Sequence, residues 1–328
     1  MLNFKTSINT STINSQSEYN SQFLKVAILL CTHQGQRFLS EQLASFEYQT
    51  HTNWVLWASD DGSEDDTTEI LQAFKNRFPN TQVFIINGPS DGFVSNFLSL
   101  ACHQKIDADY FAYADQDDIW KPDKIERAID HLINTPHNVP SLYCSRTELI
   151  NASGDHIGFS PLFKKPPSFQ NALIQNIGGG NTMVFNRSSR MLLIAAGDQA
   201  AVVSHDWWTY QLVSGVGGFV YYDSYPSLLY RQHENNLIGM NISWTSRFRR
   251  LSMLLQGRFR EWNDRHTTEL LKIKNILAQE NQTTLEAFIQ GRQSSFFQRL
   301  PKLHQSGIYR QTLLGNLGLF AAVALKKI

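Results

Sequence analysis

The chain has 328 residues, of which 42% are hydrophobic and 18% charged, and its 29 Lys and Arg balance 29 Asp and Glu. This composition excludes a disordered or collagen-like chain, and the length suits one large domain or two ordinary ones. The three cysteines are too few and too widely spaced for a disulfide framework or a Cys-x-x-Cys zinc site, so we expect a reducing compartment.

The charge is divided between an acidic body and a basic tail. Residues 1–240 carry 15 Lys and Arg against 24 Asp and Glu, whereas residues 241–328 carry 14 against 5. This division argues against nucleic-acid binding by the body, and the tail is either a membrane-contacting surface or a solvated helical face. Residues 1–24 contain 14 Ser, Thr, Asn or Gln, which predicts a disordered polar leader of a cytoplasmic protein rather than a signal peptide.

From residue 25 onward, short apolar runs alternate with segments of helical spacing. Strands are predicted at residues 25–31, 54–59, 82–87 and 110–114. Helices are predicted at residues 38–49, from Ser63 as N-cap to residue 78, at 93–105 and from Pro122 onward. This alternation is typical of βαβ units, so residues 25–145 are predicted to form an α/β half with a mainly parallel open sheet between helices.

The alternation stops after Cys144. Shorter strands are predicted at residues 181–186, 219–223 and 227–232, with helices at 187–196 and 205–213. We expect residues 146–240 to extend the same sheet, so that residues 25–240 form one domain. Residues 241–328 are predicted to form a basic helical extension.

Polar residues follow each of the four predicted parallel strands. They are Thr32-His33-Gln34-Gly35, Asp60-Asp61-Gly62-Ser63, Gly88-Pro89 and Asp115-Gln116-Asp117-Asp118. In open parallel sheets, ligands bind outside the carboxyl ends of the strands. The sequence therefore predicts a binding site at this edge.

The acidic residues at this edge suit two tasks. Asp60 or Asp61 could accept hydrogen bonds from a nucleobase, although an ordinary turn with a helix cap explains them equally well. Asp115 and Asp117, spaced Asp-x-Asp across a turn, suit a ribose and a divalent cation that bridges a diphosphate. Asp118 adds a third close carboxylate, and three such groups repel one another unless a cation or a donor compensates them.

Four motifs together resemble the family 2 glycosyltransferases, in particular their bacterial rhamnosyltransferase-like branch, which builds surface polysaccharides. They are VAILLCTHQG from Val26, SDDGS from Ser59, GFVSNF from Gly92 and ADQDDIW from Ala114. The resemblance covers residues 25–235. It implies a GT-A fold, a nucleotide-diphosphosugar donor, a divalent metal (Mg²⁺ or Mn²⁺) and inversion at the anomeric carbon.

The resemblance also assigns residues to the donor. Thr32 and Asp61 match the nucleotide-contacting positions of the family, and Asp115 and Asp117 match its Asp-x-Asp pair. Gln34, at the same strand end, is counted with the nucleotide site, as is Asp60 beside Asp61. His33 stands where many members have Tyr.

The second half supplies the predicted base. Residues 204–208 (SHDWW) resemble the acidic motif of the family at the start of a helix, and Asp206 matches its general base, which takes the proton of the acceptor hydroxyl. Without the upstream motifs, a helix N-terminal acid beside core tryptophans would explain Asp206 better. His205 could assist the base or cap the helix, and capping is the favoured expectation. Trp207 and Trp208 suit stacking on a sugar, with at least one of them in the core.

Two further segments are assigned to the diphosphate and the acceptor. The loop at residues 178–182 would let the backbone approach a sugar closely at Gly180, or is only a flexible turn. Residues 230–236 (YRQHENN) resemble a recurring segment of the branch. In it, Arg231 would neutralise diphosphate charge, and His233 is either a further metal ligand or a structural histidine.

The tail ends in an apolar segment at residues 313–325, followed by Lys326 and Lys327. Together with the arginine-rich residues 247–260, it would hold the protein at the inner face of the cell membrane, or it packs as a helix on the catalytic domain.

The sequence thus predicts an inverting glycosyltransferase that binds no nucleic acid. It would move a sugar, rhamnose by the label of the branch, from a nucleotide-diphosphate donor to a hydroxyl of a surface glycan or lipid-linked acceptor. One alternative is a phosphate-processing enzyme, disfavoured because Asp118, Ile119 and Trp120 follow the acidic pair and the first loop has only Gly35. The other is a nucleotide-sugar-binding protein without turnover.

Overall fold

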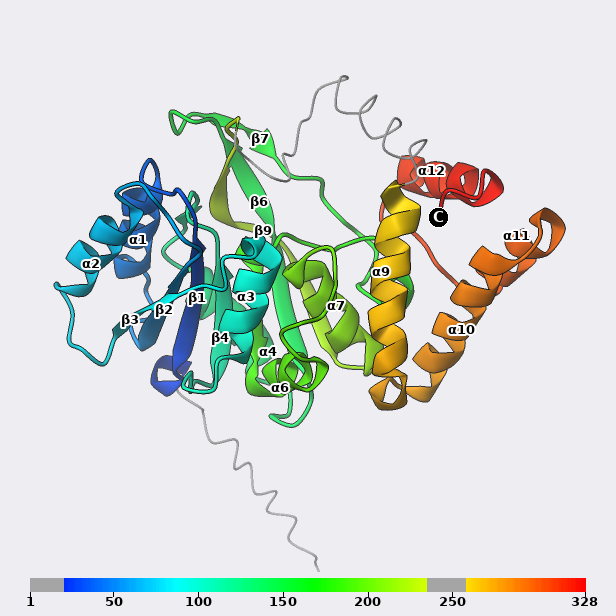
Figure 1. Cartoon of the computed structure of the whole chain (residues 1–328), viewed down its shortest axis with the longest axis horizontal. Coiled ribbons are helices and arrows are strands. Elements are labelled where there is room, and N and C mark those ends of the chain that lie inside the picture. Colours follow the sequence, from blue (N-terminus) through cyan, green and yellow to red (C-terminus); the bar gives the residue numbers. More distant parts are fainter. Residues whose placement is uncertain (1–20, 235–257) are drawn as a thin grey trace, which may run out of the picture.

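The structure is a computed structural model, and it describes residues 21–234 and 258–328 (Figure 1). Residues 1–20 of the predicted leader lie outside the described residues, and the chain after them begins with a short 3-10 helix, Ser21–Phe23. Of the arginine-rich segment at residues 247–260, the structure describes the part from Arg258 onward.

The first half of the chain forms the parallel part of the sheet. Its strands are β1 (Val26–Thr32), β2 (Trp54–Asp60), β3 (Val83–Asn87) and β4 (Tyr110–Ala114). The helices between them are α1 (Leu39–Glu47), α2 (Thr67–Lys75) and α3 (Gly92–Cys102). β1 pairs with β2 and β4, and β2 pairs with β3, all in parallel, so the expected βαβ architecture is confirmed.

The second half adds a mixed part to the same sheet. Its strands are β5 (Ile119–Trp120), β6 (Ser141–Ile150), β7 (His156–Phe159), β8 (Val184–Asn186) and β9 (Phe219–Arg231). Its helices are α4 (Lys124–Leu132), α5 (Phe169–Ala172), the 3-10 helix η2 (Gly180–Thr182), α6 (Arg187–Ala196) and α7 (His205–Gly215). In the described residues the strand order is β3-β2-β1-β4-β8-β6-β9-β5, with β7 paired to β6.

Two predicted helix starts are wrong. α2 begins at Thr67 rather than after Ser63, because the backbone N–H and hydroxyl of Ser63 both donate to the Asp60 carboxylate, at 2.9 and 2.6 Å. α4 begins at Lys124 rather than at Pro122, because the backbone N–H of Lys121 is still paired with β9. In both places a contact with a neighbouring strand outweighs the local helix signal.

The strands of the second half also differ from the prediction. Residues 181–186 are not one strand, because hydrogen bonds from Thr182 and Met183 back to the glycine loop close a 3-10 turn before β8. The two strands predicted at 219–223 and 227–232 are one strand, β9, bent where its register with β6 shifts near Arg146. β6 was not predicted, since Ser, Arg, Thr and Glu interrupt its apolar pattern.

Two hydrophobic cores lie on the two faces of the sheet. Alternate residues of β1 point to opposite faces, as its period of two requires: Ala27 and Leu29 lie in one core, Ile28 and Leu30 in the other. The first core also contains residues of α3, α6 and α7, and the second contains residues of α1, α2 and α4. Burial on both faces explains why β1 reads as an unbroken apolar run.

The expected helical extension is confirmed for residues 258–328. It comprises α9 (Arg258–Lys272), the 3-10 helix η3 (Lys274–Ile276), α10 (Gln279–Gln293), α11 (Phe296–Gln305) and α12 (Leu313–Ala324). Leu270, Leu285 and Phe288 from these helices join the core on the α3 face, which ties the extension to the sheet.

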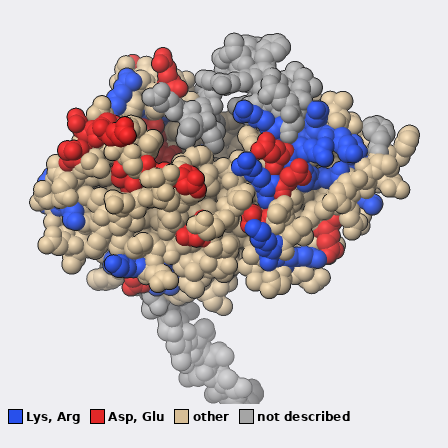
Figure 2. Space-filling view, viewed as in Figure 1, with Lys and Arg blue, Asp and Glu red and all other residues tan. Residues whose placement is uncertain are grey.

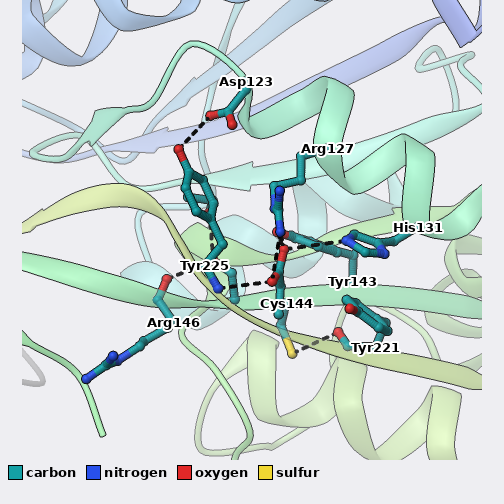
Figure 3. Close-up of polar contacts among 11 residues, drawn as sticks. Asp123, Arg127, His131, Tyr143, Cys144, Arg146, Tyr221 and Tyr225 are labelled. Atoms are coloured by element: carbon teal, nitrogen blue, oxygen red, sulfur yellow. Dashed lines mark hydrogen bonds and ion pairs between the residues drawn. The ribbon is translucent and has the colours of Figure 1, made fainter. Parts of the chain in front are cut away.

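A buried carboxylate anchors the middle of β9 to α4. Figure 3 shows the side chains that converge there, where Arg127 Nε lies 2.5 Å from Asp223 Oδ2 and the Tyr143 hydroxyl donates to the same oxygen. The Tyr225 backbone N–H donates to the other oxygen. Burial alone would raise the pKa of Asp223, but these donors and the charge of Arg127 outweigh it and hold the pKa below its ordinary value.

Asp223→Asn is expected to lower the free energy of unfolding at pH 7 by about 2–3 kcal/mol, less than a fully buried pair because Arg127 is partly exposed. A lowered folded-state pKa stabilises the protein fully above the unfolded-state value of about 4, and the stabilisation disappears as pH falls through the folded-state value. Urea unfolding should show the difference between variant and wild type closing below about pH 5.

The control is Asp107→Asn, which breaks the exposed pair of Asp107 with Arg187. It should cost less than about 1 kcal/mol. A difference for Asp223→Asn that stays constant down to about pH 2 would contradict the assigned ion pair.

Candidate functional site

The loops that follow β1, β2 and β3 meet at one edge of the sheet. The Asp61 backbone N–H donates to Thr32 O at 2.8 Å, and the Gly88 N–H donates to Asp60 O at 2.6 Å. The predicted convergence of strand ends is therefore present, and each polar side chain there can be placed by its contacts.

Asp60 and Thr32 are held inside this edge. The Thr32 hydroxyl donates to Asp60 Oδ1 at 2.8 Å, and Ser63 donates twice to the same carboxylate. Both Asp60 and Thr32 are buried. Asp60 thus organises the turn after β2, as the structural alternative for this residue predicts. Its role in nucleotide binding stays a prediction.

Asp61 holds the loop after β3. Its two carboxylate oxygens accept the backbone N–H groups of Ser90 at 2.7 Å and Gly92 at 2.9 Å. The loop passes so close that a Cβ on Gly88 would lie 2.7 Å from Asp61 Oδ1. Each carboxylate oxygen can accept a further hydrogen bond, so this fixed carboxylate retains capacity for a ligand.

The loop after β1 is clamped by a residue of the acidic motif. The Gln116 amide accepts from the His33 backbone N–H at 2.8 Å and donates to its carbonyl at 2.9 Å. A Cβ on Gly35 would lie 2.3 Å from Gln116 Oε1, so a side chain there would displace the Gln116 amide from His33. Gln34 is exposed, with a left-handed backbone (φ 51°) and its N–H bound to Ser63. Sequence reasoning missed the role of Gln116.

The three carboxylates of the acidic motif differ in environment. Asp118 is fully buried and accepts from Asn181 Nδ2 at 2.5 Å and from the Arg231 N–H at 3.3 Å. Its burial, followed by the charges of Asp117 and Asp115, raises its pKa well above the ordinary value. Asp118 is therefore a structural residue that joins the acidic turn to the second half of the chain.

Asp115 and Asp117 remain for a ligand. Burial, followed by the charges of Asp117 and Asp206, raises the pKa of Asp115 to about 8. Asp117 Oδ2 lies 2.7 Å from His233 Nε2. The residues predicted for the metal and for the base, which are about ninety positions apart in the chain, thus share one electrostatic environment.

A buried lysine, which sequence reasoning also missed, lies beneath the acidic motif. Lys124 is fully buried, and within the described residues its Nζ has no hydrogen-bond partner. The Nζ lies 3.9 Å from the centre of the Trp120 ring. Burial lowers the pKa of Lys124 to about 7, against the opposing charges of Asp118 and Asp115.

Asp206 is oriented by two backbone donors at the start of α7. Gly180 N–H donates to its Oδ2 at 3.0 Å and Trp207 N–H to its Oδ1 at 2.7 Å. Gly180 must be glycine, because a Cβ there would lie 2.4 Å from His205 Nε2 and 3.2 Å from the Asp206 Cβ. The backbone at Gly180 approaches Asp206 closely, and its predicted approach to a sugar stays a prediction.

His205 does not cap α7, contrary to the prediction. The N-cap residue is Ser204, and the His205 ring stacks on Phe97 with centroids 3.8 Å apart. Burial lowers the pKa of His205 to about 4, so the ring is neutral at pH 7. Neither ring nitrogen has a hydrogen-bond partner in the described residues.

The two tryptophans after Asp206 both lie in the core. Trp208 is 1% exposed, and Trp207 donates its indole N–H to Ala172 O at 2.6 Å and packs against His266 of α9. Trp208 therefore cannot stack on a sugar in this arrangement. The alternative that these side chains belong to the core is the one the structure supports.

Arg231 binds protein groups in place of the predicted diphosphate. It is 1% exposed, and its guanidinium donates to Asp117 O, Ala152 O and Glu41 Oε2 at 2.7–3.1 Å. Arg231 thus ties the end of β9 to the acidic turn and to α1.

A divalent metal would find two adjacent ligands here, Asp117 and His233. No group of three or more His, Cys, Asp or Glu side chains in residues 21–234 and 258–328 is arranged to hold a metal. Mg²⁺ is commonly held by one or two carboxylates together with substrate phosphates, so these two residues fit a metal that arrives with its diphosphate. Asn235 and Asn236, predicted in the same segment, lie outside the described residues.

Comparisons with known proteins agree with the resemblance seen in the sequence. The model of the family described as Glycosyl transferase family 2 matches residues 27–192. The dTDP-rhamnosyl transferase RfbG of Shigella flexneri is 30% identical over 269 residues, which cover 77% of this chain and 86% of that protein. An uncharacterized glycosyltransferase of Haemophilus influenzae is 28% identical over 113 residues, 34% of each chain.

Among solved structures, S. aureus TarS 1-349 in complex with UDP-GlcNAc superimposes with a TM-score of 0.50 at 12% identity. The match covers 87% of this chain and 93% of that one. At this identity the likeness concerns the fold, and it extends over both halves of the sheet.

Asp61→Asn is expected to loosen the loop after β3, because an amide offers one acceptor oxygen where the carboxylate offers two. One backbone N–H then loses its partner, at a cost of about 1–3 kcal/mol in the free energy of unfolding. Amide hydrogen exchange over residues 88–93 should accelerate at least about tenfold.

The matched control is Asp91→Asn in the same loop, an exposed residue whose side chain accepts from the Ser95 hydroxyl. It should leave exchange in the loop unchanged. Equal exchange rates in the two variants would show that Asp61 does not hold the loop.

Proposed function

The chain belongs to glycosyl transferase family 2 and is a GT-A glycosyltransferase with a nucleotide-sugar donor, and on this premise we propose that it transfers rhamnose from a dTDP-linked donor with inversion. The acceptor would be a hydroxyl of a surface glycan or lipid-linked saccharide. The name of the relative RfbG supports the donor sugar. Family membership also decides against the phosphate-processing and non-catalytic alternatives.

One observation supports the mechanistic part of the proposal: the charge of Asp206, from the second half of the chain, acts on Asp115 of the Asp-x-Asp pair. The charge of Asp206 contributes to the raised pKa of Asp115, which places the two carboxylates within electrostatic reach. A base from the second half can therefore act on an acceptor next to a donor held by the first half.

In this proposal Asp206 is the general base. Its carboxylate, oriented by the N–H groups of Gly180 and Trp207, takes the proton of the acceptor hydroxyl as that oxygen attacks the anomeric carbon. Asp61 and Thr32 hold the loops against which the nucleotide would bind.

Asp117 and His233 would hold the divalent metal, Mg²⁺ or Mn²⁺, with Asp115 beside them. A metal bound there would stabilise the charge that develops on the departing diphosphate. Neighbouring residues hold these side chains in place: Arg231 donates to the Asp117 carbonyl, and the hydrogen bond from Asn181 to Asp118 fixes the acidic turn.

No helix within the described residues has both the length and the apolar character needed to cross a membrane. We place the protein at the inner face of the cell membrane, in peripheral contact through its C-terminal region, where a lipid-linked acceptor would be presented.

Calorimetric titration should show that dTDP-rhamnose binds the wild type in the presence of Mn²⁺ or Mg²⁺ and at least about tenfold more weakly without metal. Asp117→Asn should abolish the effect of metal. Asp155→Asn, in the exposed turn between β6 and β7, is the control and should bind like the wild type. Tighter binding of UDP- or GDP-linked sugars would overturn the donor assignment.

Asp206→Asn should keep donor affinity within about threefold and lower the rate of transfer by about 10²–10⁴, the usual contribution of a positioned general base. The amide keeps the shape of the side chain and one backbone contact, so its folding is checked by thermal unfolding. Transfer at a near-normal rate by this variant would exclude Asp206 as the base.

A further inference from the structure

The last helix of the chain leaves a large apolar surface uncovered. On α12, Leu313, Leu317 and Phe320 follow one another at helical spacing and are 62–84% exposed. Leu314 and Leu325 lie beside them and are exposed as well. We call these five residues the α12 face.

The opposite side of α12 is anchored to the protein. Ala322 and Val323 are buried, and Val323 belongs to the core on the α3 face. The carbonyl of Val323 also accepts from the buried Arg299 of α11 at 3.2 Å. The helix is therefore held in place with one apolar side inward and a second apolar side outward. Contiguous exposed apolar patches of this kind mark interaction sites.

The surroundings of the α12 face are basic. Residues 287–328 contain six Lys and Arg and no Asp or Glu; of the six, Arg299 is buried and Arg292 is paired with Asp264 of α9. Lys326 and Lys327 follow the helix directly, and Figure 2 shows Lys and Arg side chains gathered over the C-terminal helices, with a smaller number of Asp and Glu side chains among them. An apolar helix face beside cations complements a surface that is apolar inside and anionic outside.

A loop from the catalytic domain enlarges the same basic region. The backbone N–H of Lys165 donates to Gln311 Oε1, just before α12, and its Nζ approaches the Arg310 carbonyl at 3.4 Å. Lys164 and Leu162 in this loop are exposed. Figure 1 shows α12 at the same end of the molecule as the carboxyl ends of β1 and β6, where the site lies.

We propose that the α12 face, with Lys164, Lys165, Lys326 and Lys327, binds the surface of an anionic phospholipid bilayer. A twelve-residue helix is about 18 Å long, too short to cross a bilayer but suited to lie in its interface. A second copy of this chain is the weaker occupant, because two such surfaces would bring like charges together.

This inference deepens the proposed function and rests on it in one respect: membrane binding would serve the enzyme because its acceptor is lipid-linked. Binding to the bilayer would direct the site edge toward an acceptor held in the same membrane. Binding to vesicles is measured without donor or acceptor, so its failure is distinguishable from a failure of the proposed sugar transfer.

The test is flotation of the full chain with vesicles of phosphatidylcholine alone or with about 30% phosphatidylglycerol, a fraction that makes the surface anionic. The wild type should float with the anionic vesicles, and at least about tenfold less with the neutral ones. Leu317→Asp/Phe320→Asp should remove flotation. Lys326→Glu/Lys327→Glu should reduce it at least about tenfold and remove most of its salt dependence.

The matched control is Phe23→Asp/Met191→Asp, which places the same two charges on exposed apolar residues away from α12. It should float like the wild type, and all variants should unfold at similar temperatures. Wild type that remains in solution with both vesicles overturns the proposal. So does a dimer by light scattering that Leu317→Asp/Phe320→Asp converts to a monomer, because the face would then be a contact between copies.

Discussion

The fold depends on hydrogen-bond donors for carboxyl groups that are buried away from water. Asp118 is the decisive case, because it is fully buried and its partners, Asn181 and the backbone of Arg231, come from distant parts of the chain. A buried carboxyl group without hydrogen-bond partners would be destabilising even in its neutral form, which the raised pKa of Asp118 favours. Satisfying Asp118 therefore requires η2 and β9 to meet the acidic turn, and this requirement joins the two halves of the sheet.

The same requirement explains why so few side chains remain for a ligand. Asp60 and Asp61 hold loops, Arg231 holds the acidic turn, and Gly180 holds Asp206. Asp115, Asp117 and His233 are the few polar side chains that remain for a ligand, and the surrounding loops hold them in place. Such a site needs little reorganisation when its substrates arrive, which is how preorganised polar groups favour a reaction.

The first half of the fold could be predicted from the sequence because its signals are local. β1 to β4 are buried apolar runs, and their strand ends carry the polar residues that the site uses. The second half could not be predicted as well, because β6 and β9 obtain their register from each other across a bend and mix polar with apolar residues. Asn181 and Gln116 have partners more than sixty residues away, which no local pattern reveals.

The sequence separation between Asp118 and Arg231 also sets how long the acidic turn waits for its partner during synthesis. The two residues are 113 positions apart, so a ribosome adding about 5–20 residues per second needs about 6–23 s to make the second after the first. During that interval β1 to β4 leave the ribosome and can pair, while the acidic turn still lacks the strand that encloses it. The nascent chain thus carries a hydrated, open acidic edge until β9 emerges, and the site is completed only late in synthesis.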